Sequence, residues 1–113
     1  MSLINKLKEM NFSEVEAKIY ITLLKYGKST GYEISKYSGI SRSKIYNHIE
    51  TLMSRGVLEL YSTEKVNLYK AISPEELVKL SRKSLDNTLN SFEELAKNIP
   101  LIDDAEGIWE LQD

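Results

Sequence analysis

The residues best suited to a chemical task lie in the stretch Ser41–Asn47, which reads Ser-Arg-Ser-Lys-Ile-Tyr-Asn. In contacts with nucleic acids, arginine can grip guanine through two hydrogen bonds and asparagine can do the same with adenine, whereas serine, tyrosine and lysine reach phosphate oxygens. The start of a helix also binds phosphate well, so Arg42 can contact either a base or the phosphate backbone of the nucleic acid. The stretch predicts contact with a duplex without assigning each partner.

The sequence contains no comparable cluster of residues suited to catalysis. The chain contains no cysteine, no Gly-rich phosphate loop and no His–Glu spacing typical of a metalloenzyme. His48 is the single histidine and has no second imidazole or thiolate with which to share a metal ion. We expect it on the flank of its helix, partly buried or near a phosphate. The sequence therefore predicts a protein that is not an enzyme, with no metal and no cofactor.

Charge is unevenly distributed along the chain. The formal net charge of -2 excludes a uniformly basic protein that coats nucleic acid. Residues 25–56 nevertheless carry six lysines and arginines against Glu33 and Glu50, a surplus of +4, whereas residues 73–113 have a surplus of -6. This polarity is expected when only one side of a protein faces phosphate.

Four tyrosines, Tyr20, Tyr26, Tyr32 and Tyr37, suggest an alternative in which stacked aromatic rings bind single strands. We favour packing in the core and at its boundary, because Tyr20 belongs to an apolar stripe. That stripe consists of Ala17, Tyr20, Ile21 and Leu24, spaced as on one helical face.

The elements that position residues 41–47 are marked by helix caps. Ser13 with Glu16 and Thr30 with Glu33 have capping-box spacing and predict helices that end at Gly27 and Gly39. Ser41 should cap a third helix, closed by Gly56, with Ile45, Ile49 and Leu52 on its buried face. A short leading helix is expected near residues 3–10. The order of short helix, tight turn and longer helix sets Ser43 and Asn47 on an exposed face.

A strand hairpin and a long helix follow. Residues 57–61 and 66–72 are rich in strand-forming residues and flank the polar loop 62–65, which predicts a two-stranded hairpin. Ser73-Pro74-Glu75-Glu76 then starts a helix that runs to about Asn98. Val78, Leu85, Phe92 and Ile99 recur at intervals of seven, which favours helix-to-helix packing. The intervening Ser81, Ser84, Thr88 and Ser91 weaken this stripe, so we expect an imperfect seam, either parallel or antiparallel. The residues expected to dimerise are Val78, Leu85, Leu89, Phe92, Leu95 and Ile99.

Several segments together resemble the TrmB-like transcriptional regulators of archaea and bacteria, and more broadly winged helix-turn-helix repressors. The matching stretches are residues 12–20, 41–46, 52–58 and 69–76, so the resemblance covers about residues 3–98. No single stretch is specific, but their order and spacing together are fairly so.

The resemblance implies a winged helix whose third helix enters the major groove, whose hairpin is the wing and whose long helix pairs two subunits. It places Ser41, Arg42, Ser43, Lys44, Tyr46 and Asn47 on the recognition helix. It also implies that Ser29 and Thr30 touch phosphate and that Lys65 lies at the tip of the wing. The implied partners are an operator in double-stranded DNA and a second copy of the chain.

Some features depart from the family pattern. The wing tip, residues 62–65, has one lysine beside one glutamate where the family has several basic residues, and Ser35 stands where alanine is common. Full-length members carry a sugar-sensing domain after the long helix. Residues 106–111 resemble the entry to such a domain, so we expect either a truncated form of a longer regulator or a regulator that works without this domain, and the effector is unassigned. Trp109 is expected either in a tail with little to pack against or on a partner subunit.

The predicted fold class is mostly α with a small β-hairpin. The predicted domains are a winged helix-turn-helix at 1–72, a dimerisation helix at 73–99 and a tail at 100–113. No signal peptide and no apolar run of about 20 residues is present, so a cytoplasmic protein is expected. The predicted function is a homodimeric, sequence-specific DNA-binding regulator. The alternative is a winged-helix module that binds proteins and not DNA.

Overall fold

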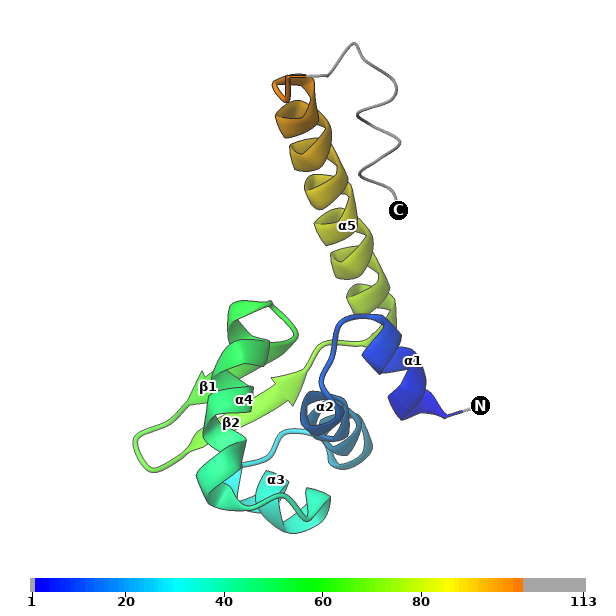
Figure 1. Ribbon diagram of the computed structural model, residues 1–113. Helices are drawn as coiled ribbons and strands as arrows, with labels where there is room; N and C mark the ends of the chain where they lie inside the picture. Colours follow the sequence, from blue (N-terminus) through cyan, green and yellow to red (C-terminus); the bar gives the residue numbers. More distant parts are fainter. Residues whose placement is uncertain (1, 101–113) are drawn as a thin grey trace. The chain divides into compact units, whose positions relative to one another are not determined.

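The computed structural model describes residues 2–100 of the 113-residue chain. The chain divides into two compact units, Met1–Ser81 and Arg82–Asp113. The first unit holds four helices, a hairpin and the start of a fifth helix (Figure 1). The elements are α1 (Leu3–Glu9), α2 (Glu14–Tyr26), α3 (Gly31–Ser38), α4 (Arg42–Ser54), β1 (Leu58–Ser62), β2 (Asn67–Ala71) and α5 (Pro74–Lys97).

The predicted starts of α2 and α3 are confirmed in detail. In each, the hydroxyl of the capping residue accepts a hydrogen bond from the third helical amide, and the glutamate at that position accepts one from the cap's own amide. The Ser73 hydroxyl likewise accepts from the Glu76 amide at 3.1 Å and begins α5. Ser41 differs, because its hydroxyl makes no cap bond to α4 and instead lies 3.2 Å from the Ser43 hydroxyl.

The core of the first unit lies where α2, α4 and the hairpin meet. Ile45, Ile49 and Leu52 of α4 are buried as predicted. The predicted stripe of α2 is wrong in part, because Leu24 is 39% exposed while Leu23 is buried. Helices α1, α3 and α4 and strand β2 all contact α2, so its buried surface is wider than a single stripe and includes Ile19.

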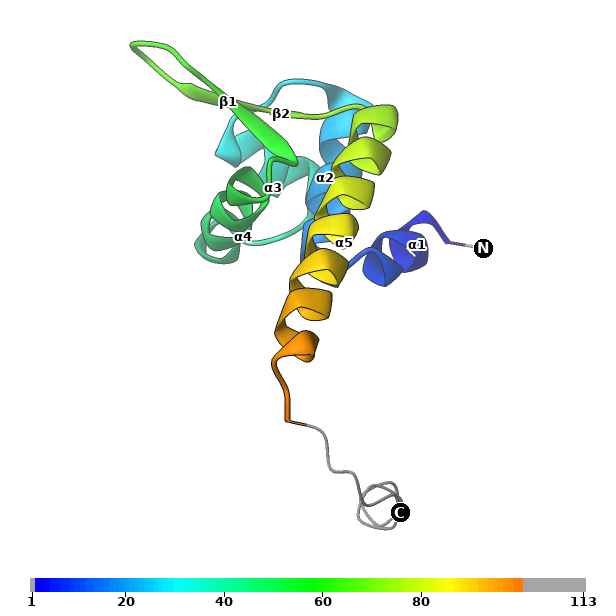
Figure 2. The ribbon, with the colours of Figure 1, turned by 90° about the horizontal axis from the view of Figure 1, so that it is seen from above.

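The hairpin is an antiparallel pair in which Leu58 lies opposite Ala71 and Ser62 opposite Asn67. Its loop extends away from α2, α3 and α4 in both views (Figures 1 and 2). Ser29, just before α3, forms an isolated antiparallel bridge to Tyr69, with backbone hydrogen bonds of 3.1 and 2.8 Å. This bridge fixes the hairpin to the segment that leads into α3.

Helix α5 changes character along its length. Leu77 is buried and Leu80 packs against the core, so the first two turns belong to the winged unit and the unit boundary falls after Ser81. The boundary expected from the sequence lay at residue 72. The predicted dimerisation residues of α5 and its end are exposed. None of the described helices has an apolar stretch long enough to cross a bilayer. Trp109 and the predicted tail beyond residue 100 lie outside the described residues.

Candidate nucleic-acid interface

Helix α4 presents a polar face opposite its buried one. Ile45 and Ile49 are held in the core, and a helix that buries one side must expose the other. Six side chains predicted to contact DNA are exposed at or near its start: Ser41, Arg42, Ser43, Lys44, Tyr46 and Asn47. The only acidic residue among the first nine positions of α4 is Glu50, so this end presents hydroxyl, amide and cationic groups.

A cluster of aromatic and cationic side chains lies at the start of α4. The Arg42 Nη2 donates a hydrogen bond of 3.3 Å to the Tyr46 hydroxyl, and the Arg42 guanidinium lies 5.6 Å from the ring centre of Tyr32 on α3. The hydrogen bond to Tyr46 raises the pKa of Arg42 above its usual value. Arg42 and Tyr46 were predicted at the interface from the sequence. Tyr32 was considered only as one of four stacking tyrosines and was assigned to packing in the core or at its boundary, whereas its side chain is 52% exposed.

This cluster borders an open cavity of about 310 Å³. The cavity is lined by residues 30–32 at the start of α3, by Arg42 and Tyr46 of α4, and by Asn67 and Tyr69 of the hairpin. Burial raises the pKa of Tyr69 above its usual value. The cavity therefore brings together donors from three segments that are separate in the sequence.

The two residues before α3 have different surroundings. Thr30 is half-buried and borders the cavity, where its hydroxyl accepts a hydrogen bond from the Glu33 amide. Ser29 is only 2% exposed, and its hydroxyl donates to the Gly27 carbonyl at 2.9 Å. The side chain of Ser29 thus has a structural role, and it does not belong to the surface that a duplex would meet.

The wing carries little charge of its own. Lys65 is exposed at the loop, beside the equally exposed Glu64. A cation from outside the hairpin also approaches it, because the Lys28 Nζ is 4.2 Å from the ring centre of Tyr61 on β1. Lys28 was counted in the basic segment but not assigned to the hairpin, since no sequence pattern links residue 28 to residue 61.

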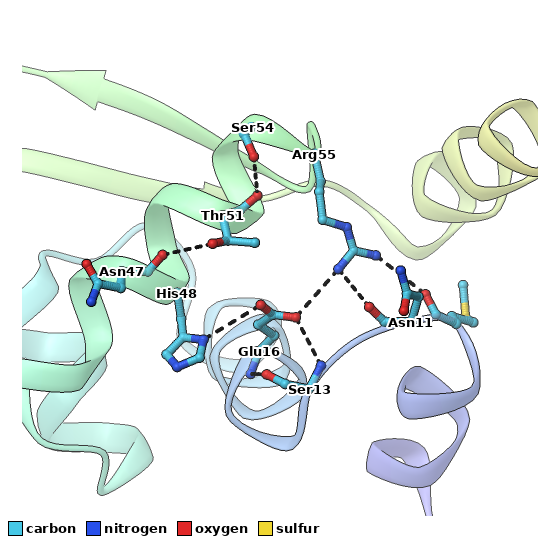
Figure 3. Close-up of polar contacts among 9 residues, drawn as sticks. Asn11, Ser13, Glu16, Asn47, His48, Thr51, Ser54 and Arg55 are labelled. Carbon is cyan, nitrogen blue, oxygen red and sulfur yellow. Dashed lines mark hydrogen bonds and ion pairs between the residues drawn. The ribbon is translucent and has the colours of Figure 1, made fainter. Parts of the chain in front are cut away.

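The far end of α4 is fixed by a buried carboxylate (Figure 3). Glu16 of α2 is 8% exposed; its Oε2 lies 3.6 Å from the Nδ1 of His48, and its Oε1 lies 3.5 Å from Arg55. Arg55 also donates to the carbonyl of Asn11 at 2.9 Å and lies over the ring of Phe12. Arg55 is therefore engaged within the fold and adds little to the surface charge that a duplex would meet.

The Asn47 side chain points away from this network (Figure 3). Its backbone carbonyl accepts a hydrogen bond of 3.0 Å from the Thr51 hydroxyl, while its side chain is exposed. His48 is half-buried on the flank of the helix, as expected. Within residues 2–100, no three histidine, aspartate or glutamate side chains are grouped so that they could hold a metal ion.

Comparison with known proteins identifies a family and relatives that this chain resembles in sequence. The profile of the family described as "Sugar-specific transcriptional regulator TrmB" matches residues 7–75. The chain is 32% identical over 111 residues to the protein YrhO of Bacillus subtilis, covering 97% of this chain and 40% of that protein. It is 28% identical over 102 residues to the "HTH-type sugar sensing transcriptional regulator TrmBL1" of Pyrococcus furiosus, covering 86% and 29%. The chain thus spans less than half the length of these relatives.

Solved structures share the fold. TrmBL2, described as an archaeal chromatin protein, superimposes with a TM-score of 0.77 at 19% identity, covering 84% of this chain and 36% of that one. YusO of Bacillus subtilis superimposes with a TM-score of 0.56 at 16% identity, covering 84% and 74%. The predicted fold class, mostly α with a β-hairpin, is confirmed. The matched family is one of transcription regulators rather than of enzymes. Because the family profile matches more than half of its residues, this chain belongs to the TrmB family of winged-helix transcriptional regulators.

Proposed function

We propose that this chain binds a specific operator in double-stranded DNA as a homodimer and that α4 enters the major groove. The observation that supports this most is the exposed start of α4, where cationic, amide and hydroxyl side chains stand opposite a fully buried apolar face. Helices that read DNA present their N-terminal half to base edges. The proposed contact residues are Thr30, Ser41, Arg42, Ser43, Lys44, Tyr46, Asn47 and Lys65.

The proposed roles differ by residue type. Arg42 and Asn47 have the bidentate groups that recognise guanine and adenine edges, so we assign them to bases. Lys44 and Lys65 are point charges that neutralise phosphate without reading sequence. TrmBL2 is described as binding DNA, and TrmBL1 is named as a transcriptional regulator. We propose DNA as the partner of this chain too, which would act in the cytoplasm where its operator lies.

The proposed dimer uses the exposed side of α5. Leu85, Phe92 and Ile99 recur at intervals of seven, and all three are more than half exposed. An apolar stripe on a helix can pack against a second copy of itself, and two-fold dimers are the commonest oligomers. We propose a two-fold dimer through Val78, Leu85, Leu89, Phe92, Leu95 and Ile99. Its two α4 helices would lie about 34 Å apart, one turn of the duplex.

Selection of bound fragments from random duplexes tests this function directly. The expected result is an enriched, roughly palindromic site, and affinity that falls with salt at a log-log slope near -0.9 for each neutralised phosphate. If no duplex is enriched and binding is absent or independent of salt, the chain acts instead as a winged-helix module that binds proteins.

A further inference from the structure

Arg42 is held in place before any partner arrives. An exposed arginine ordinarily samples many rotamers, and fixing one on binding costs conformational entropy. Here the guanidinium donates to the Tyr46 hydroxyl one turn later on α4, at 3.3 Å, and faces the Tyr32 ring of α3 at 5.6 Å. Both tyrosines are themselves substantially exposed. These two rings therefore have the geometry of a support for Arg42 rather than of a core.

Gly31 makes room for this support. A Cβ atom at residue 31 would lie 2.6 Å from the Tyr46 hydroxyl oxygen and 2.7 Å from its Cε1, closer than such atoms ever approach. Gly31 does not have a positive φ, so its backbone would accept alanine. Glycine at residue 31 thus leaves the space that the Tyr46 ring occupies against the start of α3.

The supported arginine keeps its recognition surface free. The guanidinium has five N–H donors, and the bond to Tyr46 uses one of them. Arg42 borders the open cavity between α3, α4 and the hairpin, on the side of α4 proposed to face DNA. A bidentate pair of N–H groups is what guanine O6 and N7 require in the major groove. Because the two N–H groups are already oriented, binding costs less conformational entropy. A base that does not present two acceptors in this position gains less from the contact.

We infer that Tyr46 and Tyr32, accommodated by Gly31, are positioning residues that align Arg42 with one guanine of each operator half-site. The inference rests on the proposed function. It assigns specificity at a single base pair to two tyrosines and a glycine that need not touch that base. It also assigns Arg42 to a base and not to a phosphate.

The test compares fragments selected from random duplexes by the wild-type chain and by Tyr46→Phe, Tyr32→Ala, Gly31→Ala and Arg42→Ala variants. Tyr46→Phe keeps the ring and removes only the acceptor. Its expected effect is a roughly three- to tenfold loss of preference for guanine at one position, comparable to the net contribution of one typical intramolecular hydrogen bond. The other positions of the site should keep their preferences. Arg42→Ala should abolish the preference at that same position.

The double variant Arg42→Ala/Tyr46→Phe tests whether the effect of Tyr46 on base preference depends on Arg42. If Tyr46 acts through Arg42, adding Tyr46→Phe to Arg42→Ala changes the selected sequence no further. Tyr37→Phe is the matched control, because Tyr37 is an exposed tyrosine of α3 whose ring stacks on Tyr26 at 4.2 Å, and it should select the wild-type site. Thermal melting of each variant verifies that it is folded. If Gly31→Ala does not fold, Tyr46→Phe carries the test.

Three outcomes decide the matter. Guanine preference that weakens in Tyr46→Phe and is abolished in Arg42→Ala at one shared position supports the inference. Unchanged preference in Tyr46→Phe and Tyr32→Ala overturns it, and so does a uniform loss on all duplexes with a salt slope smaller by about one, which marks a phosphate contact. If the wild-type chain itself enriches no duplex, the proposed function fails instead, and the two failures are distinguishable.

Discussion

Individual side chains on the exposed start of α4 divide into those suited to read sequence and those suited to neutralise charge. Asn47 projects an amide that can pair bidentately with adenine, whereas Lys44 carries only a flexible point charge. The same exposed surface therefore supports two kinds of contact that respond differently to substitution.

Replacing Asn47 by alanine should cost about 1–3 kcal/mol on the cognate site and relax the preference at one base pair. Replacing Lys44 by alanine should weaken binding evenly on cognate and random duplexes and lower the salt slope by about one. Fluorescence anisotropy titrations at several salt concentrations measure both quantities. Equal losses on both duplexes for Asn47→Ala would mean that the base reader has been misassigned.

Glu16 is expected to contribute to the stability of the fold. It accepts the Ser13 amide at 3.0 Å in the cap of α2 and faces His48 and Arg55 of the α4 segment. Glu16→Ala should lower the free energy of unfolding by about 2 kcal/mol, chiefly through the lost cap bond and the partners left without a carboxylate. Urea unfolding followed by circular dichroism measures this change.

The control is Glu14→Ala. Glu14 occupies the same turn of α2, but its pair with Lys18 is solvent-exposed at 3.8 Å. Such a pair contributes less than about 1 kcal/mol. If both variants lost the same stability, the interaction of Glu16 with α4 would have no measurable value.

Some features of the helices and strands could be predicted from the sequence alone, and others could not. The capping residues of α2, α3 and α5 were evident, because a cap is a local pattern within four residues. The buried set of α2 was predicted only in part, since it depends on four neighbours that the sequence does not place. The burial of Ser29 and the approach of Lys28 to Tyr61 arise from pairing between distant segments, which no local pattern encodes.

The turn between α3 and α4 provides a test at this scale. Gly39 ends α3 with a φ of 77° in the left-handed region, and its amide donates to the Ser35 carbonyl at 3.0 Å. A Cβ atom there would meet nothing within 4 Å, so Gly39→Ala reports the backbone cost alone. We expect a loss of about 1–2 kcal/mol in unfolding free energy. Gly39→Asn should lose less, because asparagine tolerates this conformation. Equal stability of Gly39→Ala and the wild type would contradict this account.

The molecule as a whole is proposed to function as a pair. The chain carries a cationic start of α4 in one unit and an exposed apolar stripe in the rest of α5. A dimer would link two modest half-site affinities into one tight interaction, because the second contact becomes intramolecular.

Phe92→Glu should therefore dissociate the dimer and weaken operator binding by an order of magnitude or more. Phe92 is 67% exposed, so the substitution leaves no cavity in the described fold. Asn90→Glu adds the same charge about 160° around the helix and should leave the dimer intact. Light scattering at micromolar concentration gives the mass of each variant. A wild-type chain that is monomeric under these conditions would refute the proposed dimer.

The main-chain bridge between Ser29 and Tyr69 has a mechanical consequence for the winged unit. Two amide-to-carbonyl bonds join strand β2 to the approach of α3, and Tyr69 also borders the cavity beside Arg42. In the proposed complex, a hairpin displaced by contact with a duplex would pull on these two bonds and so on the cavity walls around Arg42. Because both bonds join main-chain atoms, substitutions elsewhere on the wing would change what it touches and leave these two bonds in place.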